Sequence, residues 1–163
     1  MVQKRRVGDI VKRLDYFAAL GMVKLLDDNR VAANLKGQIM PHIKAEDAAI
    51  FEIPNVRFEG LASPSRGARE TAVWRVTLAP NAPGGLHSLS REEVLVALSG
   101  VAEARIGEIT HRFAAGDAIV VPAETTFALA NPGPEIFVAI AVLPVGAQAR
   151  MGTEPAFTPP WAL

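Results

Sequence analysis

The amino-acid sequence predicts an all-β sandwich or barrel that follows a helical segment. From Ala48 onward, apolar residues occur in short runs, and the clearest runs alternate with a period of two. Turn-forming Gly, Pro, Asn and Ser residues separate these runs at regular spacing, as in all-β domains. Before Ala48, apolar residues recur instead with the 3.6-residue period of an amphipathic helix. The change of period therefore predicts two differently built parts of the chain.

Composition supports this division and narrows the function classes. Residues 1–45 hold nine Lys and Arg against four Asp, a balance of +5, whereas residues 46–163 hold eight Arg against thirteen Asp and Glu, a balance of −5. The whole chain has a net charge of zero, so nothing global predicts a nucleic-acid or membrane partner. No apolar stretch is long enough for a bilayer span, and no secretory signal is recognisable. We therefore expect a cytoplasmic protein.

The first part, residues 1–46, is predicted to be a helical extension. Val7, Ile10, Val11, Leu14, Phe17 and Ala18 share one helix face. A second, less regular helical piece is predicted over about 22–35, which makes residues 7–36 mostly helical. Two helices in about 40 residues, with no recognition-helix pattern, do not favour a DNA-binding domain. We expect this extension to pack on the barrel or on a second subunit.

The second part, residues 47–148, is predicted to be the barrel. Its strands are expected at 50–53, 56–61, 70–79, 94–98, 101–106, 106–113, 118–121, 125–130 and 135–143. Residues 149–163 form a Pro-rich tail that we predict to be extended. Trp161 in this tail is expected to pack on the barrel surface or across an interface, rather than to touch a ligand.

One stretch, residues 85–131, carries two spaced motifs. The first motif consists of Gly85, His87, Glu93 and Gly100, and the second of Gly116, Pro122 and Asn131. Together they resemble the two motifs of the cupin superfamily, whose small double-stranded β-helix barrels are also called jelly rolls. This resemblance implies a cupin barrel, which the alternating pattern by itself does not specify.

The resemblance also implies a metal site, but two of its ligand positions are lost. Metal-binding cupins use three His and one Glu, and only His87 and Glu93 match that set. Leu89 and Phe127 stand where the other two His would be, and neither can coordinate a metal. Catalytic metal sites usually have three protein ligands. We therefore expect no cofactor, and His87 and Glu93 remain the candidate ligands if a divalent metal binds with a further donor.

The same four residues define the predicted pocket. We expect His87, Leu89, Glu93 and Phe127 to face one another at the barrel mouth, leaving a small and largely apolar space. His87 and Glu93 are interpreted either as an inert hydrogen-bonded pair or as candidate catalytic residues that act as acid and base on a bound molecule.

Three functions remain open from the sequence. The first is binding of a small, partly apolar molecule in a barrel with a degenerate metal site. The second is a metal-dependent cupin enzyme of the isomerase or dioxygenase type that uses His87 and Glu93. The third is an interaction protein that acts through its basic N-terminal helices. A homodimer is expected in each case, because an open sandwich has strand edges that need cover.

Overall fold

A computed structural model of the protein describes residues 32–33 and 39–163. The chain divides into two compact units, Met1–His42 and Ile43–Leu163. In the first unit, β1 (Ala32–Ala33) pairs antiparallel with β2 (Ile39–Met40). Of the helix expected over about 22–35, the structure describes only Ala32–Ala33, and these two residues are in a strand, because they pair with a segment containing β-branched Ile39. The rest of the predicted helical residues 7–36 lies outside the described residues.

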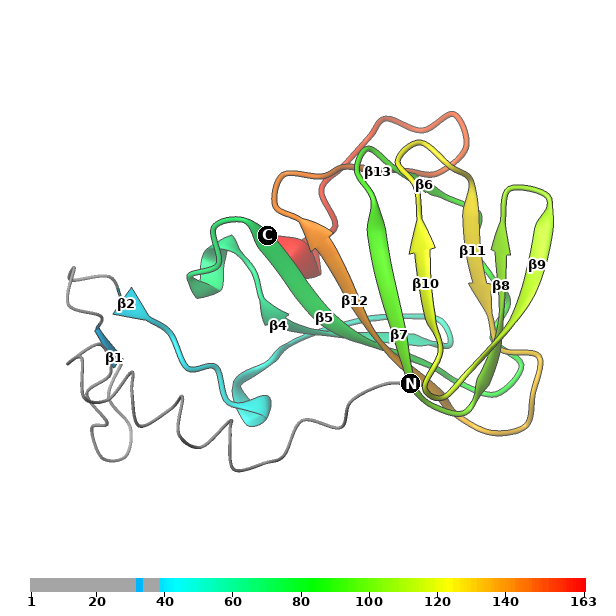
Figure 1. Cartoon of the computed structure of the whole chain (residues 1–163), viewed down its shortest axis with the longest axis horizontal. Helices are drawn as coiled ribbons and strands as arrows, with labels where there is room; N and C mark the ends of the chain where they lie inside the picture. Colours follow the sequence, from blue (N-terminus) through cyan, green and yellow to red (C-terminus); the bar gives the residue numbers. More distant parts are fainter. Residues whose placement is uncertain (1–31, 34–38) are drawn as a thin grey trace, which may run out of the picture. The chain divides into compact units, whose positions relative to one another are not determined.

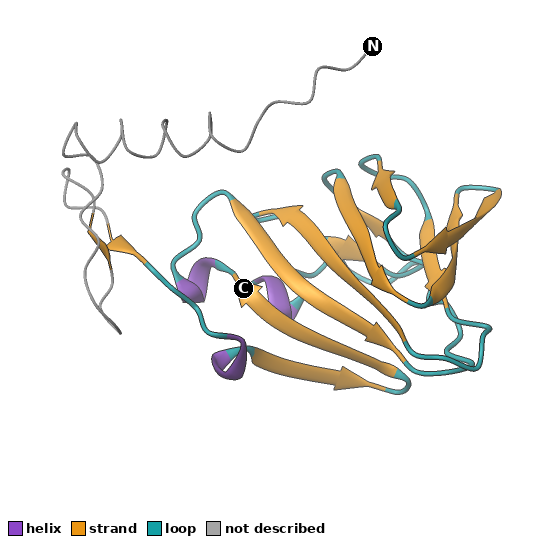
Figure 2. Cartoon of the chain, turned by 60° about the horizontal axis from the view of Figure 1, so that its bottom comes forward, coloured by secondary structure: helices purple, strands orange, loops and turns teal. Residues whose placement is uncertain are grey.

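The second unit is built almost entirely of short strands (Figure 2). Its strands are β3 (Ala49–Ile53), β4 (Val56–Ala62), β5 (Thr71–Leu78), β6 (Ser88–Leu89), β7 (Glu93–Ser99), β8 (Val101–Ile106), β9 (Ile109–Ala114), β10 (Ala118–Val121), β11 (Phe127–Ala130), β12 (Phe137–Pro144) and β13 (Ala149–Arg150). Three single 3-10 turns accompany them, η1 (Ala45–Asp47), η2 (Pro64–Arg66) and η3 (Pro160–Ala162). The all-β prediction from residue 48 is therefore confirmed.

The strands form a jelly-roll arrangement of antiparallel sheets (Figure 1). The larger sheet has the order β10-β7-β12-β5-β4-β3, and the smaller one has the order β11-β8-β9. A third, two-stranded sheet pairs β13 with β6. Most neighbours in the larger sheet are distant in sequence, as the pairing of β12 with both β5 and β7 shows.

Alternating side chains from these sheets fill one apolar core. On β5 and β12 every second residue is buried, and these residues are Ala72, Trp74, Val76, Leu78, Phe137, Ala139, Ala141 and Leu143. Phe113 on β9 meets Phe137 on β12 with ring centroids 5.5 Å apart, which joins the smaller sheet to the larger one. The period-two pattern is thus explained, because successive strand residues point to opposite faces of a sheet.

Asn131 ties two loops of the barrel together from a fully buried position. Its side-chain amide donates to the carbonyl oxygens of Leu78, Ala79 and Glu135 at 3.3, 3.0 and 2.7 Å. Its side-chain oxygen accepts a hydrogen bond from the Gly133 N–H at 3.1 Å. The second-motif Asn therefore has a structural role, since buried backbone carbonyls need donors.

The C-terminal tail is less extended than the sequence predicts. Ala149 and Phe157 exchange two backbone hydrogen bonds of 2.7 and 2.9 Å, so the chain between them folds back on itself. The chain then ends in η3, where Ala162 is buried and the Leu163 carbonyl accepts a hydrogen bond from Ser65. No helix in the described part of the chain is long and apolar enough to cross a membrane.

Candidate functional site

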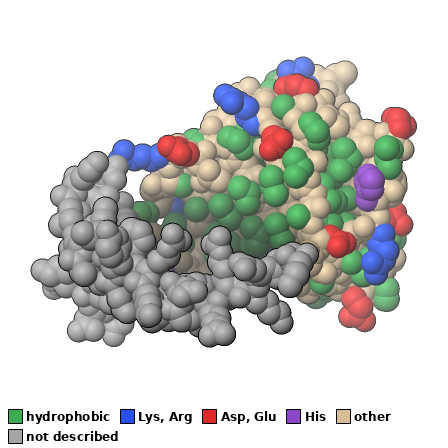
Figure 3. Space-filling view, in the orientation of Figure 1, with side chains coloured by type: hydrophobic (Ala, Val, Ile, Leu, Met, Phe, Trp, Pro, Cys, Tyr) green, Lys and Arg blue, Asp and Glu red, His purple; other side chains and the backbone are tan. Residues whose placement is uncertain are grey.

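A cavity of about 320 Å³ lies inside the barrel unit. Its wall comes from β4, β5, β7 and β11, from the loop that leads to His87, and from the C-terminal tail. Figure 3 shows many hydrophobic side chains on the described face of the barrel unit. The volume is at the lower end of the roughly 300–1,000 Å³ typical of small-molecule sites.

The structure places the four predicted pocket residues in the wall of this cavity. His87, Leu89, Glu93 and Phe127 all line it, and Leu89 and Phe127 are buried. His87 and Glu93 are the two ionisable side chains of the lining, and every other lining residue is apolar or glycine. Among the residues that the structure describes, no Lys or Arg lines the wall, so this part of the chain offers a negatively charged molecule no fixed cation there.

Glu93 is the first residue of β7, where it lies opposite Val121 of β10. Its side chain is only 4% exposed, and its Oε2 atom is buried without a hydrogen-bond partner among the described residues. Burial disfavours the charged form of a carboxyl group and raises the pKa of Glu93 to about 8. At neutral pH this group is therefore mostly a neutral carboxylic acid that can donate a hydrogen bond.

His87 is held by the loop that precedes β6 and by β11. Its backbone N–H and C=O exchange hydrogen bonds of 2.9 and 2.7 Å with Phe127. Its ring Nδ1 lies 2.9 Å from the carbonyl oxygen of Gly85. A carbonyl can only accept, so Nδ1 carries the hydrogen of this bond, and Nε2 is the ring nitrogen left for a ligand.

The hydrogen-bonded His87–Glu93 pair considered from the sequence is not formed. No hydrogen bond or ion pair joins these two side chains in the described structure. The His87 ring Nδ1 instead bonds the carbonyl oxygen of Gly85, two residues earlier in the chain. Glu93 Oε2 is buried and has no hydrogen-bond partner among the described residues. The two groups are therefore separate polar points in one apolar wall.

The residues present do not fit a catalytic metal site. Glu93 has an unpartnered oxygen that could serve as a ligand, and His87 has a free Nε2. However, no group of three or more His, Cys, Asp or Glu residues is close enough to hold a metal anywhere in the described residues. His111, the one further His on a described barrel strand, is exposed on β9. A catalytic site usually needs three protein ligands.

The sequence missed the part of the wall that comes from the C-terminal tail. Met151, Phe157, Pro159 and Trp161 line the cavity. Trp161 stacks on Phe58 with ring centroids 3.6 Å apart and planes at 3°. The sequence predicted that Trp161 packs on the barrel rather than at a ligand site. It does pack there, but its ring also closes one side of the cavity.

Comparisons with known proteins agree with this architecture. Residues 74–143 match the family model described as "Cupin domain". A search of curated proteins finds no match. The polyketide cyclase RemF from Streptomyces resistomycificus superposes with a TM-score of 0.64 at 15% identity, covering 72% of this chain and 88% of that one.

Two further solved structures show the same fold. A sugar phosphate isomerase from a cupin superfamily, from Silicibacter pomeroyi, has a TM-score of 0.58 at 14% identity, covering 70% of this chain and 83% of that one. An RmlC-like cupin from Shewanella frigidimarina has a TM-score of 0.55 at 17% identity, covering 62% and 86%. At these identities the similarity concerns the fold alone.

Proposed function

The chain belongs to the cupin superfamily, and from this premise we propose that its barrel binds a small, partly apolar molecule. The observation that carries this proposal is the composition of the cavity wall, which is apolar except for His87, Glu93 and the indole N–H of Trp161. Small-molecule sites typically combine an apolar lining with a few polar groups that fix orientation. Glu93 Oε2 supports the same reading, because a buried polar atom without a partner is costly unless a ligand satisfies it.

The lining also favours an uncharged molecule. Burying a charge is unfavourable unless it is paired, and the lining formed by the described residues has no Lys or Arg that could pair with an anion. Structural neighbours include proteins described as a sugar phosphate isomerase and a predicted oxalate decarboxylase, and both descriptions name anions. We therefore do not extend either activity to this chain.

Binding can be tested with cyclohexanol and benzyl alcohol as probes in calorimetric titrations of the whole protein. Leu89→Trp places a larger side chain in the cavity wall, so it should abolish binding of both probes. The matched control is Ile109→Trp at a 63% exposed site on β9, outside the cavity lining, which should leave binding unchanged. Absence of binding to the unmodified protein, or equal binding to both variants, would contradict the proposal.

A second candidate is acid–base catalysis on the bound molecule. Glu93 can donate a proton while His87 Nε2 can accept one, and both face the same cavity. General acid–base groups contribute about 10²- to 10⁴-fold to rates when they are positioned on a substrate. The metal-dependent alternative has less support, because only two donors are present. A turnover assay on any identified ligand, run with chelator, would separate the two, since only acid–base catalysis survives the chelator.

We also propose a homodimer formed through the outer face of the larger sheet. Val94, Val96 and Leu98 of β7 point away from the core, and Val96 lies opposite Ile140 of β12. On the edge strand β10, Val120 lies opposite Val94. Val96, Leu98 and Val120 are 37%, 51% and 52% exposed, so this part of the sheet is an apolar patch open to solvent.

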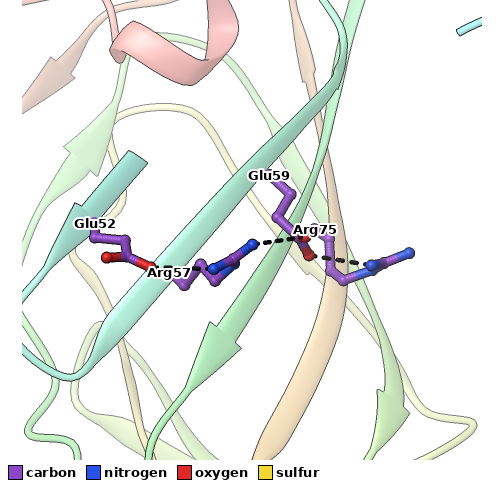
Figure 4. Close-up of polar contacts among 4 residues, drawn as sticks. All are labelled: Glu52, Arg57, Glu59 and Arg75. Carbon is purple, nitrogen blue, oxygen red and sulfur yellow. Dashed lines mark hydrogen bonds and ion pairs between the residues drawn. The ribbon is translucent and has the colours of Figure 1, made fainter. Parts of the chain in front are cut away.

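The charges beside this patch favour a second copy of the chain as its partner. On β3, β4 and β5 the outer face carries Glu52, Arg57, Glu59 and Arg75, joined by ion pairs of 3.1 to 3.5 Å (Figure 4). Two acids and two bases give this region no net charge, so two copies can meet there without repulsion. The apolar patch then supplies the contact, because exposed patches of this kind mark interaction sites.

Light scattering at several protein concentrations tests the dimer. Val120→Glu should shift the protein to monomer, since it buries a charge in the interface. Ile109→Glu, at a 63% exposed site on β9 of the other sheet, is the control and should remain dimeric. A monomer at all concentrations would refute the dimer and assign the patch to another partner. The third sequence hypothesis, interaction through the basic N-terminal helices, falls outside the described residues and stays a prediction.

A further inference from the structure

The aromatic residues of this chain are concentrated around the cavity. The chain holds seven Phe, two Trp and one Tyr. Five of these ten line the cavity, namely Phe58, Trp74, Phe127, Phe157 and Trp161. An apolar lining alone would be served by Leu, Ile and Val, which also line part of it. This concentration of rings therefore calls for a more specific explanation than apolarity.

Three of the five rings, those of Phe58, Trp74 and Trp161, form one connected aromatic wall on the β4 and β5 side. Trp161 stacks face to face on Phe58 and lies at 59° to Trp74, with ring centroids 6.4 Å apart. Phe51 meets the same indole edge-on at 6.3 Å. Such contacts fix the ring positions before any ligand arrives, because each aromatic pair prefers a defined geometry. A rigid wall of this kind selects by shape.

Glu93 lies on the other side of the cavity from Trp161, whose indole Nε1 is itself buried without a hydrogen-bond partner among the described residues. Phe58 is on β4 and Glu93 is on β7, and the sheet order places β5 and β12 between these strands. Three strand spacings correspond to at most about 14 Å across the sheet. Glu93 therefore meets a ligand across the sheet from the Trp161–Phe58 pair, while His87 lies beside Phe127 of β11, with ring centroids 5.5 Å apart.

Trp161 belongs to the C-terminal tail, and several contacts of this tail hold it against the barrel. Phe157 is fixed by its two backbone hydrogen bonds to Ala149. Ala162 is buried, and the terminal Leu163 carbonyl is bound by Ser65. The carbonyl oxygen of Trp161 also sits over Gly60, where a Cβ atom would be only 3.2 Å from it. Trp161 is thus held in the cavity wall by the fold.

We infer that the molecule bound in this cavity is a flat, uncharged aromatic compound of one or two rings with a hydroxyl or carbonyl oxygen, and that Trp161 is the residue that selects for the flat ring. This inference rests on the proposed binding function and names the ligand class. The ring lies against the aromatic wall, and the oxygen meets the carboxyl group of Glu93 or the free Nε2 of His87. The described lining holds no Lys or Arg, which disfavours an ionised substituent because a buried charge needs a partner.

Four bicyclic probes separate the elements of this inference in calorimetric titrations of the whole protein near neutral pH. They are 2-naphthol, its saturated counterpart decahydro-2-naphthol, naphthalene without the oxygen, and the anion 2-naphthoate. We expect 2-naphthol to bind most tightly, roughly three- to tenfold better than decahydro-2-naphthol, which is the contribution typical of aromatic contacts. Loss of the oxygen should weaken binding by a similar factor. The anion should bind at least about tenfold more weakly.

Variants of the wall assign the selectivity to Trp161. Trp161→Leu should bind 2-naphthol and decahydro-2-naphthol with similar affinity. Trp161→Phe should retain most of the preference for the flat ring of 2-naphthol. If Trp161→Leu does not fold, as judged by circular dichroism, Phe157→Leu provides a second test, and it should reduce the same preference. An unchanged preference in every folded Leu variant would overturn the role of the wall.

The outcomes distinguish this inference from the proposed function. Equal binding of 2-naphthol and decahydro-2-naphthol overturns the aromatic class but keeps small-molecule binding. Tightest binding of 2-naphthoate overturns the uncharged class. No binding of any probe, together with no binding of cyclohexanol or benzyl alcohol, overturns both.

Discussion

Glu93→Gln tests most directly whether the carboxyl group of Glu93 is neutral in the apolar cavity wall. Gln has the shape of a protonated Glu but stays neutral at every pH, so it mimics the carboxylic acid that burial imposes on Glu93. The substitution should therefore cost little at acidic pH. At alkaline pH it should make the protein more stable than the wild type, because the wild type must then hold a charge in an apolar wall.

The magnitude follows from the pKa of Glu93, which burial raises from 4.5 to about 8. Below pH 4.5 both the folded and the unfolded chain carry the proton. Between 4.5 and about 8 the folded state binds more protons than the unfolded state, so the free energy of unfolding falls as pH rises. At 1.36 kcal/mol per pH unit, the stability lost across this window is at most about 5 kcal/mol, and about 3 kcal/mol of it is lost by pH 7.

Urea unfolding at pH 5, 7 and 8.5 measures this difference. The wild type should lose stability relative to Glu93→Gln as pH increases, while other titrating groups cancel between the two proteins. Glu92→Gln is the matched control, since Glu92 is the exposed neighbour on the same strand end and should follow the wild type. If the free energy of unfolding changed with pH in the same way for the wild type and Glu93→Gln, the inference that the Glu93 carboxyl group is neutral would be refuted.

Three further substitutions test the loops and turns that hold the strands of the barrel in place. Asn131→Ala leaves several buried backbone groups without their hydrogen bonds and should lower the free energy of unfolding by about 3 kcal/mol or more, measured by urea unfolding. Gly100 and Gly116 both have positive φ, at 75° and 91°. Gly100→Ala should unfold the protein at ordinary temperature, because the new Cβ overlaps the Ile136 carbonyl oxygen, whereas Gly116→Ala has open space and should cost only about 1–2 kcal/mol. Thermal melts of the two glycine variants measure this difference. Equal losses of stability in Gly100→Ala and Gly116→Ala would show that the turn at Gly100 can move to accommodate the new Cβ.

Much of the barrel could be predicted from the sequence, because strand periodicity is a local property. The strand expected at 70–79 is found as Thr71–Leu78, and its buried side chains are the alternating ones. Motif spacing was equally informative about position, since His87, Leu89, Glu93 and Phe127 come from three strands and a loop yet line one cavity. Spacing works here because the register of a sheet with one buried face is strongly specified.

The contacts made by the tail and the loops could not be predicted from strand periodicity or motif spacing. Trp161 and Phe58 are about a hundred residues apart, and neither belongs to a periodic pattern that would place the tail over the cavity. The partner of His87 depended on the conformation of the preceding loop, which brought the Gly85 carbonyl to the ring. Such long-range and loop-dependent contacts decide the shape and polarity of the site, so the ligand class required the structure.

Replacing the apolar side chains at the two lost ligand positions by histidine tests whether their loss is what prevents metal binding. Leu89→His together with Phe127→His would place four donors in one wall, and His87 already has its Nδ1 held by Gly85, which leaves Nε2 free for a metal. We expect this double variant to bind zinc, nickel or manganese, detected by calorimetry and by metal analysis of the dialysed protein. Metal binding should also lower the pKa of Glu93, since a nearby cation favours the carboxylate. The stability of the loaded variant should therefore no longer fall between pH 5 and 8. Stoichiometric metal held by the unmodified protein would instead show that His87 and Glu93 suffice, and the metal-dependent enzyme would then be the better hypothesis.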